Sequence, residues 1–474
     1  MMNNERTTVC VVGGGPAGMV LGLLLARAGI QVTVLEKHAD FLRDFRGDTV
    51  HASTLTLLDE LGLGERFAQL PQRRLDRVVV QLDGGTAQLT DLSRLPGAHQ
   101  HIALVPQWDF LDLLADAAEV EPTFTLRRNA EVVGLLRDGG RVTGVRYRDR
   151  VAGTEHELVA GLTVGCDGRD SAVREAAGLS PRSFGVPMDV WWFRLTRRAD
   201  DPAGGVGRFS TGHFAVMIDR GDYWQCGYLI RKGTDVALRA AGIEELRRRF
   251  AGLLPWMADR VDHLATWDDV KLLNVKLERL RRWYGDGLLL IGDAAHAMSP
   301  VGGVGINLAV ADAVATARLL AAPLRRAGRV SRTDLRRVQL RRWWPTALIQ
   351  TGQRLVHRAV LGRALAANPA TAAARTGLPL PIRLLQRFPV LQGIPARLVA
   401  IGPLPEHAPQ WARRSPESAS RPAPRSFAPG TASQDSPPSA PQATPGGGAD
   451  AVRPHTGAGS AIPHSPTRRK PTRS

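Results

Sequence analysis

Cysteine is scarce in this sequence of 474 residues, which contains only Cys10, Cys166 and Cys226. The three cysteines lie far apart, and no two of them have the spacing of a paired motif. This pattern excludes a disulfide framework and a zinc site built from cysteine pairs, and it is typical of a reducing compartment. We therefore expect a cytoplasmic protein without a metal site.

Acidic residues are scarce in the C-terminal third. The formal net charge is +17, and residues 323–363 contain 11 arginines and one acidic residue, whereas residues 1–322 contain 38 basic and 40 acidic residues. The first 322 residues therefore do not predict a nucleic-acid partner. Residues 413–474 are rich in proline, serine, alanine and glycine and poor in large apolar residues, which predicts a disordered basic tail.

A long apolar run without helix breakers is also absent near the N-terminus. Residues 9–26 carry no charge, but Gly13, Gly14, Gly15 and Pro16 interrupt the run in its middle. We therefore expect neither a signal peptide nor an integral membrane segment.

The same glycines belong to the segment "TTVCVVGGGPAGMVLGLLLARAGIQVTVLEK", which predicts a strand, a turn, a helix over about 16–28 and a strand over 32–35. Gly13 permits a tight turn, Gly15 lets a pyrophosphate approach the backbone, and Gly18 lets the helix pack closely on the strand. The helix N-terminus favours phosphates, and Glu36 can accept the hydroxyls of an adenosine ribose. The segment predicts a dinucleotide site, which could hold FAD or NAD.

A second segment, "LLLIGDAAHAMSPVGGVGIN" over 288–307, favours FAD. Its strand ends at Gly292 and Asp293, so a carboxylate reaches the edge of the sheet where α/β folds bind ligands. The glycine-rich loop leads into a helix that we expect over 307–322, ended by Pro323. Exposed backbone N–H groups and a helix N-terminus make a pocket for negative charge, which a reduced flavin ring requires.

These two segments and "CDGRDSAVR" at 166–174 resemble the three signatures of the single-component FAD-dependent aromatic hydroxylases, the para-hydroxybenzoate hydroxylase-like class A. The resemblance covers about residues 7–365. It implies an α/β fold in which a Rossmann-type, GR2-like FAD-binding domain carries an inserted mixed β-sheet domain for the substrate, followed by C-terminal helices. We assign the FAD-binding domain to 1–72, 105–182 and 280–330, the substrate domain to 73–104 and 183–279, and the C-terminal helices to 331–405.

The resemblance also implies roles for single residues. Asp293 would bind the ribityl chain, and Pro300 and Arg46 would serve catalysis, Pro300 at the face of the isoalloxazine ring where oxygen reacts. His296 would be structural rather than a base. The cofactor-binding residues would be Gly13, Gly15, Ala17, Gly18, Glu36, Lys37, Arg46, Gln107, Asp167, Gly168, Asp293, Pro300, Gly303, Gly305, Ile306 and Asn307.

Candidate substrate contacts come from the hairpin "HFAVMIDRGDYWQCGYLI". Because side chains alternate along a strand, Tyr223 and Gln225 lie on one face of their strand and Trp224 and Cys226 on the other. Which face points toward the flavin is left open, and we expect substrate contacts from Tyr223, Gln225, Met217 and His213.

By the resemblance, NADPH or NADH would reduce FAD, O2 would form a flavin C4a-hydroperoxide, and one oxygen would be transferred to an aromatic or polyketide-like small molecule. The enzyme would be a monomer or homodimer. A second dinucleotide fingerprint, which a disulfide reductase would carry, is absent from the sequence.

Three alternatives remain at this stage. One is an FAD-dependent reductase, oxidase or dehydrogenase on the same fold, because fold does not fix the reaction. A flavin-dependent halogenase is disfavoured by the absence of a Trp-x-Trp-x-x-Ile pattern. The third is a non-catalytic flavin-binding protein whose basic C-terminus associates with membranes.

Overall fold

The computed structural model describes residues 5–42, 49–202, 204–210, 212–358, 383 and 386–415. Contacts group Met1–Pro422 into one compact unit, and the description below concerns its described residues. Arg46 and residues 416–474 of the expected tail lie outside them.

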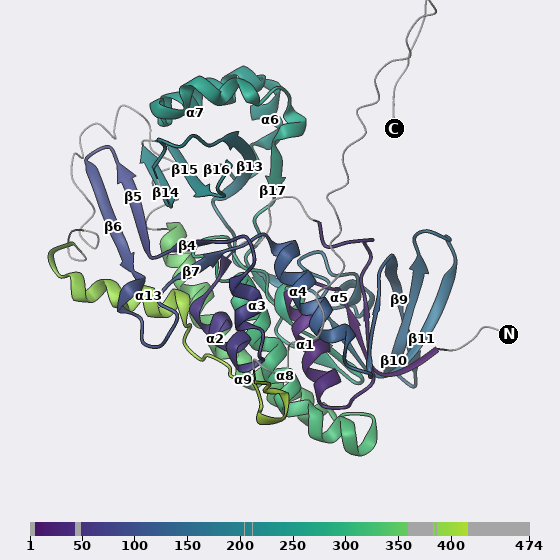
Figure 1. The fold of residues 1–474 in the computed structure, drawn as a ribbon. Coiled ribbons are helices and arrows are strands. Elements are labelled where there is room, and N and C mark those ends of the chain that lie inside the picture. The colour runs from purple at the N-terminus through teal and green to yellow at the C-terminus, as the bar shows by residue number, and fades with distance from the viewer. Residues whose placement is uncertain are drawn as a thin grey trace, which may run out of the picture. The chain divides into compact units, whose positions relative to one another are not determined.

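The described residues form an eight-stranded sheet, whose strands β9 and β10 lie at the right of Figure 1. Its parallel strands lie in the order β20-β11-β1-β2-β8. They are β1 (Glu5–Val12), β2 (Val32–Leu35), β8 (Phe124–Arg127), β11 (Glu155–Gly165) and β20 (Leu288–Leu290). Antiparallel strands complete the sheet: β9 (Ala130–Asp138), β10 (Arg141–Asp149) and β19 (Tyr284–Gly285).

Apolar helices cover this sheet. The helix α1 (Pro16–Arg27) is buried from Ala17 to Ala26 and packs against α4 (Gln107–Glu119) and α8 (Gly305–Ala327). Because α1 is apolar on all sides, it is a core helix of the domain rather than an amphipathic surface helix.

The helix α8 differs from the sequence-based expectation, which placed its end at Pro323. It continues through Pro323 and ends before Gly328, whose φ of +62° gives a left-handed cap. A proline removes only one backbone donor, so a helix that is packed along its length can continue past it. By length and composition α8 could cross a membrane, but 61% of the apolar window lies buried inside the protein. It is followed by α9 (Arg332–Val356), which begins with a capping box between Ser331 and Asp334.

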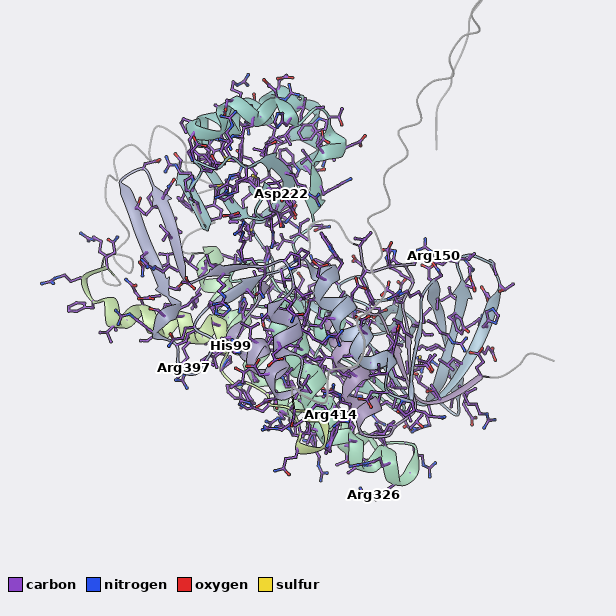
Figure 2. All side chains as sticks on the ribbon, in the orientation of Figure 1. His99, Arg150, Asp222, Arg326, Arg397 and Arg414 are labelled. Atoms are coloured by element: carbon purple, nitrogen blue, oxygen red, sulfur yellow. The ribbon has the colours of Figure 1, made fainter. Side chains whose placement is uncertain are left out.

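A seven-stranded sheet has the order β17-β13-β16-β15-β14-β5-β6. The turn at Asp222 connects β15 to β16 (Figure 2). The helices α6 (Asp235–Ala240) and α7 (Ile243–Leu253) and the 3-10 helix η2 (Pro255–His263) cover one face (Figure 1). The strands are β5 (Arg77–Leu82), β6 (Gly85–Asp91), β13 (Met188–Thr196), β14 (Gly205–Ser210), β15 (His213–Asp219), β16 (Tyr223–Arg231) and β17 (Lys271–Leu273).

Two small sheets connect these parts. β3 (Thr49–Val50) and β4 (Arg73–Leu75) pair with β7 (Ile102–Leu104), and β12 (Arg182–Ser183) pairs with β18 (Glu278–Arg279). The remaining helices are α2 (Ala52–Glu60), α3 (Gly64–Ala68), α5 (Ala172–Ala176) and α13 (Gly393–Ala400). Short 3-10 turns are η1 (Leu92–Arg94), η3 (Trp267–Asp269), η4 (Gly292–Ala294), η6 (Pro389–Gln392) and η7 (Gln410–Ala412).

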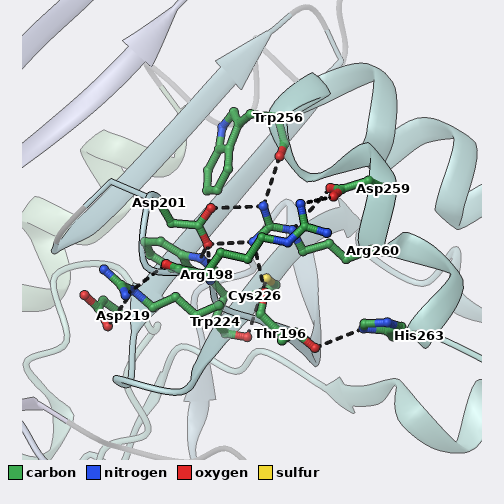
Figure 3. A network of polar contacts seen from close by, with 11 residues as sticks. Thr196, Arg198, Asp201, Asp219, Trp224, Cys226, Trp256, Asp259, Arg260 and His263 are labelled. Carbon is green, nitrogen blue, oxygen red and sulfur yellow. Dashed lines mark hydrogen bonds and ion pairs between the residues drawn. The ribbon is translucent and has the colours of Figure 1, made fainter.

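A buried polar network fastens η2 to the seven-stranded sheet (Figure 3). The Arg260 guanidinium donates to both carboxylate oxygens of Asp201 at 2.6 and 2.9 Å, and the Trp224 indole N–H donates to Asp201 at 2.8 Å. Burial opposes ionisation of Asp201, but the hydrogen bonds from Arg260 and Trp224 outweigh it and hold the Asp201 pKa well below its usual range. The network fixes the outer layer of this sheet.

Candidate active site

The candidate site lies at the carboxyl end of the parallel sheet. Val12 stands opposite Gly165 in β11 and Leu35 in β2, and Gly165 stands opposite Leu290 in β20. This register brings the segments that follow the four strands to one edge, although they are far apart in the sequence. Open α/β sheets bind their ligands at this edge.

The glycine turn leaves room beside the N-terminus of α1. Gly13 has a φ of +101°, and a Cβ at Gly18 would lie 1.9 Å from the Gly13 carbonyl oxygen. A Cβ at Gly15 would have no heavy atom within 4 Å. Gly18 is therefore required by packing within the protein, whereas Gly15 borders the open space that a pyrophosphate would fill.

Glu36 lies directly beside this turn. Its side chain is 7% exposed, and its two oxygens accept the N–H groups of Gly14 at 2.9 Å and His38 at 3.0 Å. These bonds orient the carboxylate beside the glycine turn, where a dinucleotide ribose is expected.

Asp167 is engaged within its own loop. Its carboxylate accepts the Ser171 hydroxyl at 2.5 Å and the Val173 N–H at 3.0 Å, and burial raises its pKa. Gly168 follows with a φ of +84°. The side chain of Asp167 thus holds the start of α5 in place beside the glycine turn.

Asp293 is held at the end of β20 with its carboxylate partly exposed. The preceding Gly292 has a φ of +59°, and its N–H donates to Asp312 at 3.1 Å. The Asp293 side chain is 28% exposed and accepts one hydrogen bond from Arg169 at 3.4 Å. This carboxylate can therefore still accept hydroxyl groups.

His296 is buried in an ionic network with Asp312. It is 1% exposed and its Nε2 lies 2.5 Å from the carboxylate of Asp312, which also accepts Arg342 Nε at 3.0 Å. Burial disfavours the charged form of Asp312, but His296 and Arg342 outweigh burial and hold the Asp312 pKa below its usual value. A buried imidazole in this network is not available to a substrate.

The loop before α8 is held by hydrogen bonds from Thr49 of β3 and from His51, the residue before α2. Gly302 and Gly303 have φ values of +84° and +63°. The Thr49 hydroxyl donates to the Gly303 carbonyl at 3.0 Å, and the His51 N–H donates to Asn307 Oδ1 at 3.1 Å. Asn307 lies in the first turn of α8, and its side-chain oxygen faces the segment that follows β3.

The sequence-based reasoning missed His51. Its Nδ1 lies 2.9 Å from the Val399 carbonyl, which can only accept, so Nδ1 carries the proton and Nε2 is an acceptor. Burial lowers the His51 pKa to about 4, which keeps the ring neutral. The polar run "TVHAST" after Arg46 was the available signal.

Two buried polar atoms beside this loop match the edge of a flavin ring. Among the described residues, His51 Nε2 and Asn307 Nδ2 have no hydrogen-bond partner. One is an acceptor and the other a donor, and the pyrimidine ring of a flavin offers both kinds of group. Buried polar atoms are rarely left unpaired, so these residues fit FAD.

The loop around Pro300 is fixed from α9. Gln353 Nε2 donates to the carbonyls of Ser299 at 2.9 Å and Val301 at 2.8 Å, and the Ser299 hydroxyl lies 2.9 Å from His357 Nε2. Pro300 itself is partly exposed. A rigid loop with an accessible proline is suited to line the face of a flavin ring where a substrate must enter.

One face of the seven-stranded sheet lies against this loop. Val301 packs with an apolar cluster from that face, composed of Met188, Val190, Trp192, Phe209, Phe214, Leu229, Leu273 and Val275 together with Val186. The face therefore supplies an aromatic wall next to Pro300.

The expected substrate residues divide between the two faces. Tyr223 and Gln225 share the face of Trp192, since Gln225 stands opposite Arg194. Gln225 is 3% exposed and accepts Arg220 Nε at 2.9 Å.

His213 and Met217 lie on the opposite face, which is covered by α7. Met217 packs in the cluster that contains Phe250, and His213 Nδ1 lies 2.5 Å from the Tyr228 hydroxyl. Burial lowers the pKa of His213 and raises the pKa of Tyr228 to about 12.

Trp192 occupies the better position for a substrate contact. It lies over Gly227, where a Cβ would come within 2.9 Å of the indole ring. The Trp192 Nε1 is buried and has no acceptor among the residues that the structure describes. The pairing of β13 with β16, which sets Trp192 opposite Gly227, could not be predicted from the sequence.

The other expected cofactor residues lie at helix starts or beside Glu36. Gln107 begins α4, Ala17 is buried in the first turn of α1, and Gly305 and Ile306 open α8. Lys37 is exposed next to Glu36.

Comparison with known proteins identifies the family. A family model described as an FAD binding domain matches residues 6–335. This chain belongs to that family of FAD-dependent, aromatic-hydroxylase-like monooxygenases. The family resemblance, the fold class and the enzyme class that the sequence predicted are thereby confirmed.

The relatives include two monooxygenases from Streptomyces rimosus. The 6-methylpretetramide 4-monooxygenase of Streptomyces rimosus is 37% identical over 328 residues, which cover 68% of this chain and 77% of that protein. The 12-dehydrotetracycline 5-monooxygenase/anhydrotetracycline 6-monooxygenase of Streptomyces rimosus subsp. rimosus is 30% identical over 330 residues, 65% of this chain and 61% of that protein.

A solved structure agrees with these relatives. The anhydrotetracycline hydroxylase OxyS of Streptomyces rimosus has a TM-score of 0.65 and 26% identity, over 84% of this chain and 76% of that chain. The flavoenzyme thus has both the sequence and the fold of a monooxygenase.

Proposed function

We propose that this monooxygenase hydroxylates an aromatic, polyketide-like small molecule, with NADPH or NADH as the reductant and O2 as the oxygen source. One oxygen atom enters a C–H bond of the substrate, and the other leaves as water with two electrons from the reductant. The observation that carries the proposal is the aromatic wall of Trp192, Phe209 and Phe214 packed beside the Pro300 loop.

The chain's residues have distinct tasks in this reaction. When bound, FAD supplies the redox chemistry by passing electrons from the reductant to oxygen. We assign Gly15 and the α1 N-terminus to the pyrophosphate, Glu36 to the ribose, and Asp293 to the ribityl chain. His51 and Asn307 would hold the ring edge through their unpartnered buried atoms.

The site supports a substrate that is largely aromatic with a few polar groups. Trp192, Phe209 and Phe214 offer ring surfaces, and Phe209 and Phe214 already meet edge to face with centroids 5.5 Å apart. Trp192 Nε1 would donate to a substrate oxygen. The names of the tetracycline-pathway relatives support a fused-ring polyketide.

Among the sequence-based candidates, we propose Tyr223 and Gln225 as substrate contacts. We do not propose His213 and Met217, because they lie on the face covered by α7. Pro300 remains the proposed ring-face residue. Arg46 stays a prediction for catalysis. We also propose a cytoplasmic location, on the basis of the scarce cysteines, and a monomer or homodimer stays a prediction.

The test is product analysis under oxygen-18 gas. Purified flavin-loaded enzyme is incubated with NADPH or NADH and a panel of naphthacene-type polyketides, and the products are analysed by mass spectrometry. We expect one compound to stimulate consumption of the reductant and to gain one oxygen-18 atom. The Asp293→Ala variant, which should lack flavin, is the control.

Two results would contradict the proposal. Reductant consumption that yields only hydrogen peroxide with every compound would indicate an oxidase. Dehydrogenated products without label would indicate a dehydrogenase on the same fold.

A further inference from the structure

Three arginines surround a single aromatic ring, Phe184, which packs against the apolar cluster of Met298 and Val304. The guanidinium carbons of Arg182, Arg279 and Arg354 lie 5.4, 5.3 and 5.1 Å from the centre of the Phe184 ring. They come from β12, β18 and α9, so three elements converge on this point. Arg279 also lies 4.6 Å from the centre of the Trp343 ring.

This arrangement places like charges close together. Arg182 and Arg279 are direct Cα partners in the antiparallel pair of β12 and β18, and like charges at such positions are destabilising. Burial, Arg182 and Arg354 together lower the pKa of Arg279. One aromatic ring attracts cations only weakly, so Phe184 does not neutralise three charges.

No acidic side chain among the described residues forms an ion pair with any of the three. Glu278 is the neighbour of Arg279 in β18, but side chains alternate along a strand and direct it to the other face. Moreover, Arg279 Nη1 and Arg354 Nε are buried without a hydrogen-bond acceptor in the part of the chain that the structure describes. Buried donors of this kind call for a partner.

We propose that Arg182, Arg279 and Arg354 form a binding site for a phosphate group. Guanidinium groups match the oxygens of a phosphate in pairs, and a dianion would satisfy both buried donors and offset the repulsion. The phosphate could belong to the nicotinamide reductant, since NADPH carries a ribose phosphate that NADH lacks, or could be free inorganic phosphate.

The site is connected to the loop that carries Pro300. Arg354 stands on α9 between Gln353 and His357, the two residues that hold Ser299. A phosphate bound at Arg354 would therefore order the same turn of α9 that fixes the loop.

The test is calorimetric titration of the oxidised, flavin-loaded enzyme with inorganic phosphate at low salt. We expect one phosphate per chain, and Arg279→Gln or Arg354→Gln should weaken binding about tenfold or more, because each removes charge-assisted hydrogen bonds. Arg182 is exposed, so Arg182→Gln keeps the test valid if a variant at a more buried position loses stability. The control is Arg336→Gln, an exposed position on the same helix.

Competition identifies the source of the phosphate. If NADP+ displaces inorganic phosphate and NAD+ does not, the site takes the reductant; if neither competes, it takes free phosphate. Failure of the wild-type enzyme to bind phosphate, or equal binding by all variants, would overturn the proposal. Since no turnover is measured, the result is independent of the proposed hydroxylation.

Discussion

At the scale of single residues, the glycines of the first turn have different reasons to be glycine. Gly18 is required because its Cβ would collide with the Gly13 carbonyl oxygen, whereas the space at Gly15 is open on the protein side. A substitution of Gly18 should therefore destabilise the protein, whereas a substitution of Gly15 should weaken only cofactor binding.

We predict that Gly15→Ala leaves the thermal stability of the flavin-free protein unchanged and weakens FAD binding about tenfold or more, because the added methyl group would lie where the pyrophosphate approaches the backbone. Gly18→Ala should lower both FAD binding and the stability of the flavin-free protein. Fluorescence titration with FAD and thermal melts of stripped protein measure the two effects. Equal melting temperatures for the two stripped variants would contradict the distinction between Gly15 and Gly18.

A second residue-scale prediction concerns Gly227. A Cβ there would meet the Trp192 ring at 2.9 Å, so Gly227→Ala should displace Trp192 from the aromatic wall. We expect an unchanged FAD content and a rise of about fivefold or more in the KM for the aromatic substrate, since an ordered aromatic contact is worth about 1 kcal/mol. Gly252→Ala, in an open position of α7, is the control. Loss of flavin instead would place Trp192 in cofactor binding.

At the scale of elements, the sequence predicted the periodic segments well and the orientation of faces poorly. The βαβ unit and the hairpin around Asp222 follow directly from apolar spacing and glycine turns. Alternation showed that Tyr223 and Gln225 share a face, but both faces of β16 are buried, one under α7 and one against the Pro300 loop. When both faces are covered, alternation alone cannot tell which one meets the cofactor.

The C-terminal end of α8 also could not be predicted from the sequence. Pro323 predicted an end, but tertiary packing carries the helix on to Ala327. His51 was missed for a similar reason, since its significance depends on contacts with Val399 and Asn307 that only the fold creates.

The ion pair that attaches η2 to the seven-stranded sheet gives a prediction about stability. Arg260 and Asp201 are each 4% exposed in their side chains, so Arg260→Leu would leave a buried carboxylate without its partner. We expect a loss of about 3 kcal/mol in the free energy of unfolding, measured by urea denaturation. Arg198→Leu is the control, because its ion pair with Asp259 is exposed on both sides and should contribute less than about 1 kcal/mol.

The same pair predicts how stability depends on pH. The folded-state pKa of Asp201 is depressed, so its stabilising contribution is present above the unfolded pKa of about 4 and is lost as pH falls toward the folded value. Urea midpoints measured between about pH 6 and pH 3 should fall less steeply in Arg260→Leu than in the wild type. If the urea midpoints of the wild type and Arg260→Leu fell in parallel with pH, Asp201 would not contribute to acid sensitivity.

At the scale of the whole molecule, a buried ionic cluster connects the flavin edge to the C-terminal part of the chain. Asp312 in α8 accepts the Gly292 N–H, contacts His296 and is bound by Arg342 of α9, which also contacts Glu406. All four charged or ionisable side chains are at most 4% exposed. The position of Asp293 therefore depends on Arg342 and Glu406, which lie 49 and 113 positions after it in the sequence.

We accordingly predict that Arg342→Met impairs both folding and cofactor retention. Removal of Arg342 leaves Asp312 and Glu406 buried without this partner, which should cost about 3–5 kcal/mol of unfolding free energy. The Gly292–Asp293 turn would loosen because Asp312 loses its orientation, so the variant should release FAD faster during dialysis. Arg336→Met, on the exposed side of α9, should change neither quantity. If Arg342→Met were destabilised but retained FAD like the wild type, the ionic cluster would support the helices alone, and Asp293 would be held by Arg169 and the strand end without help from α9.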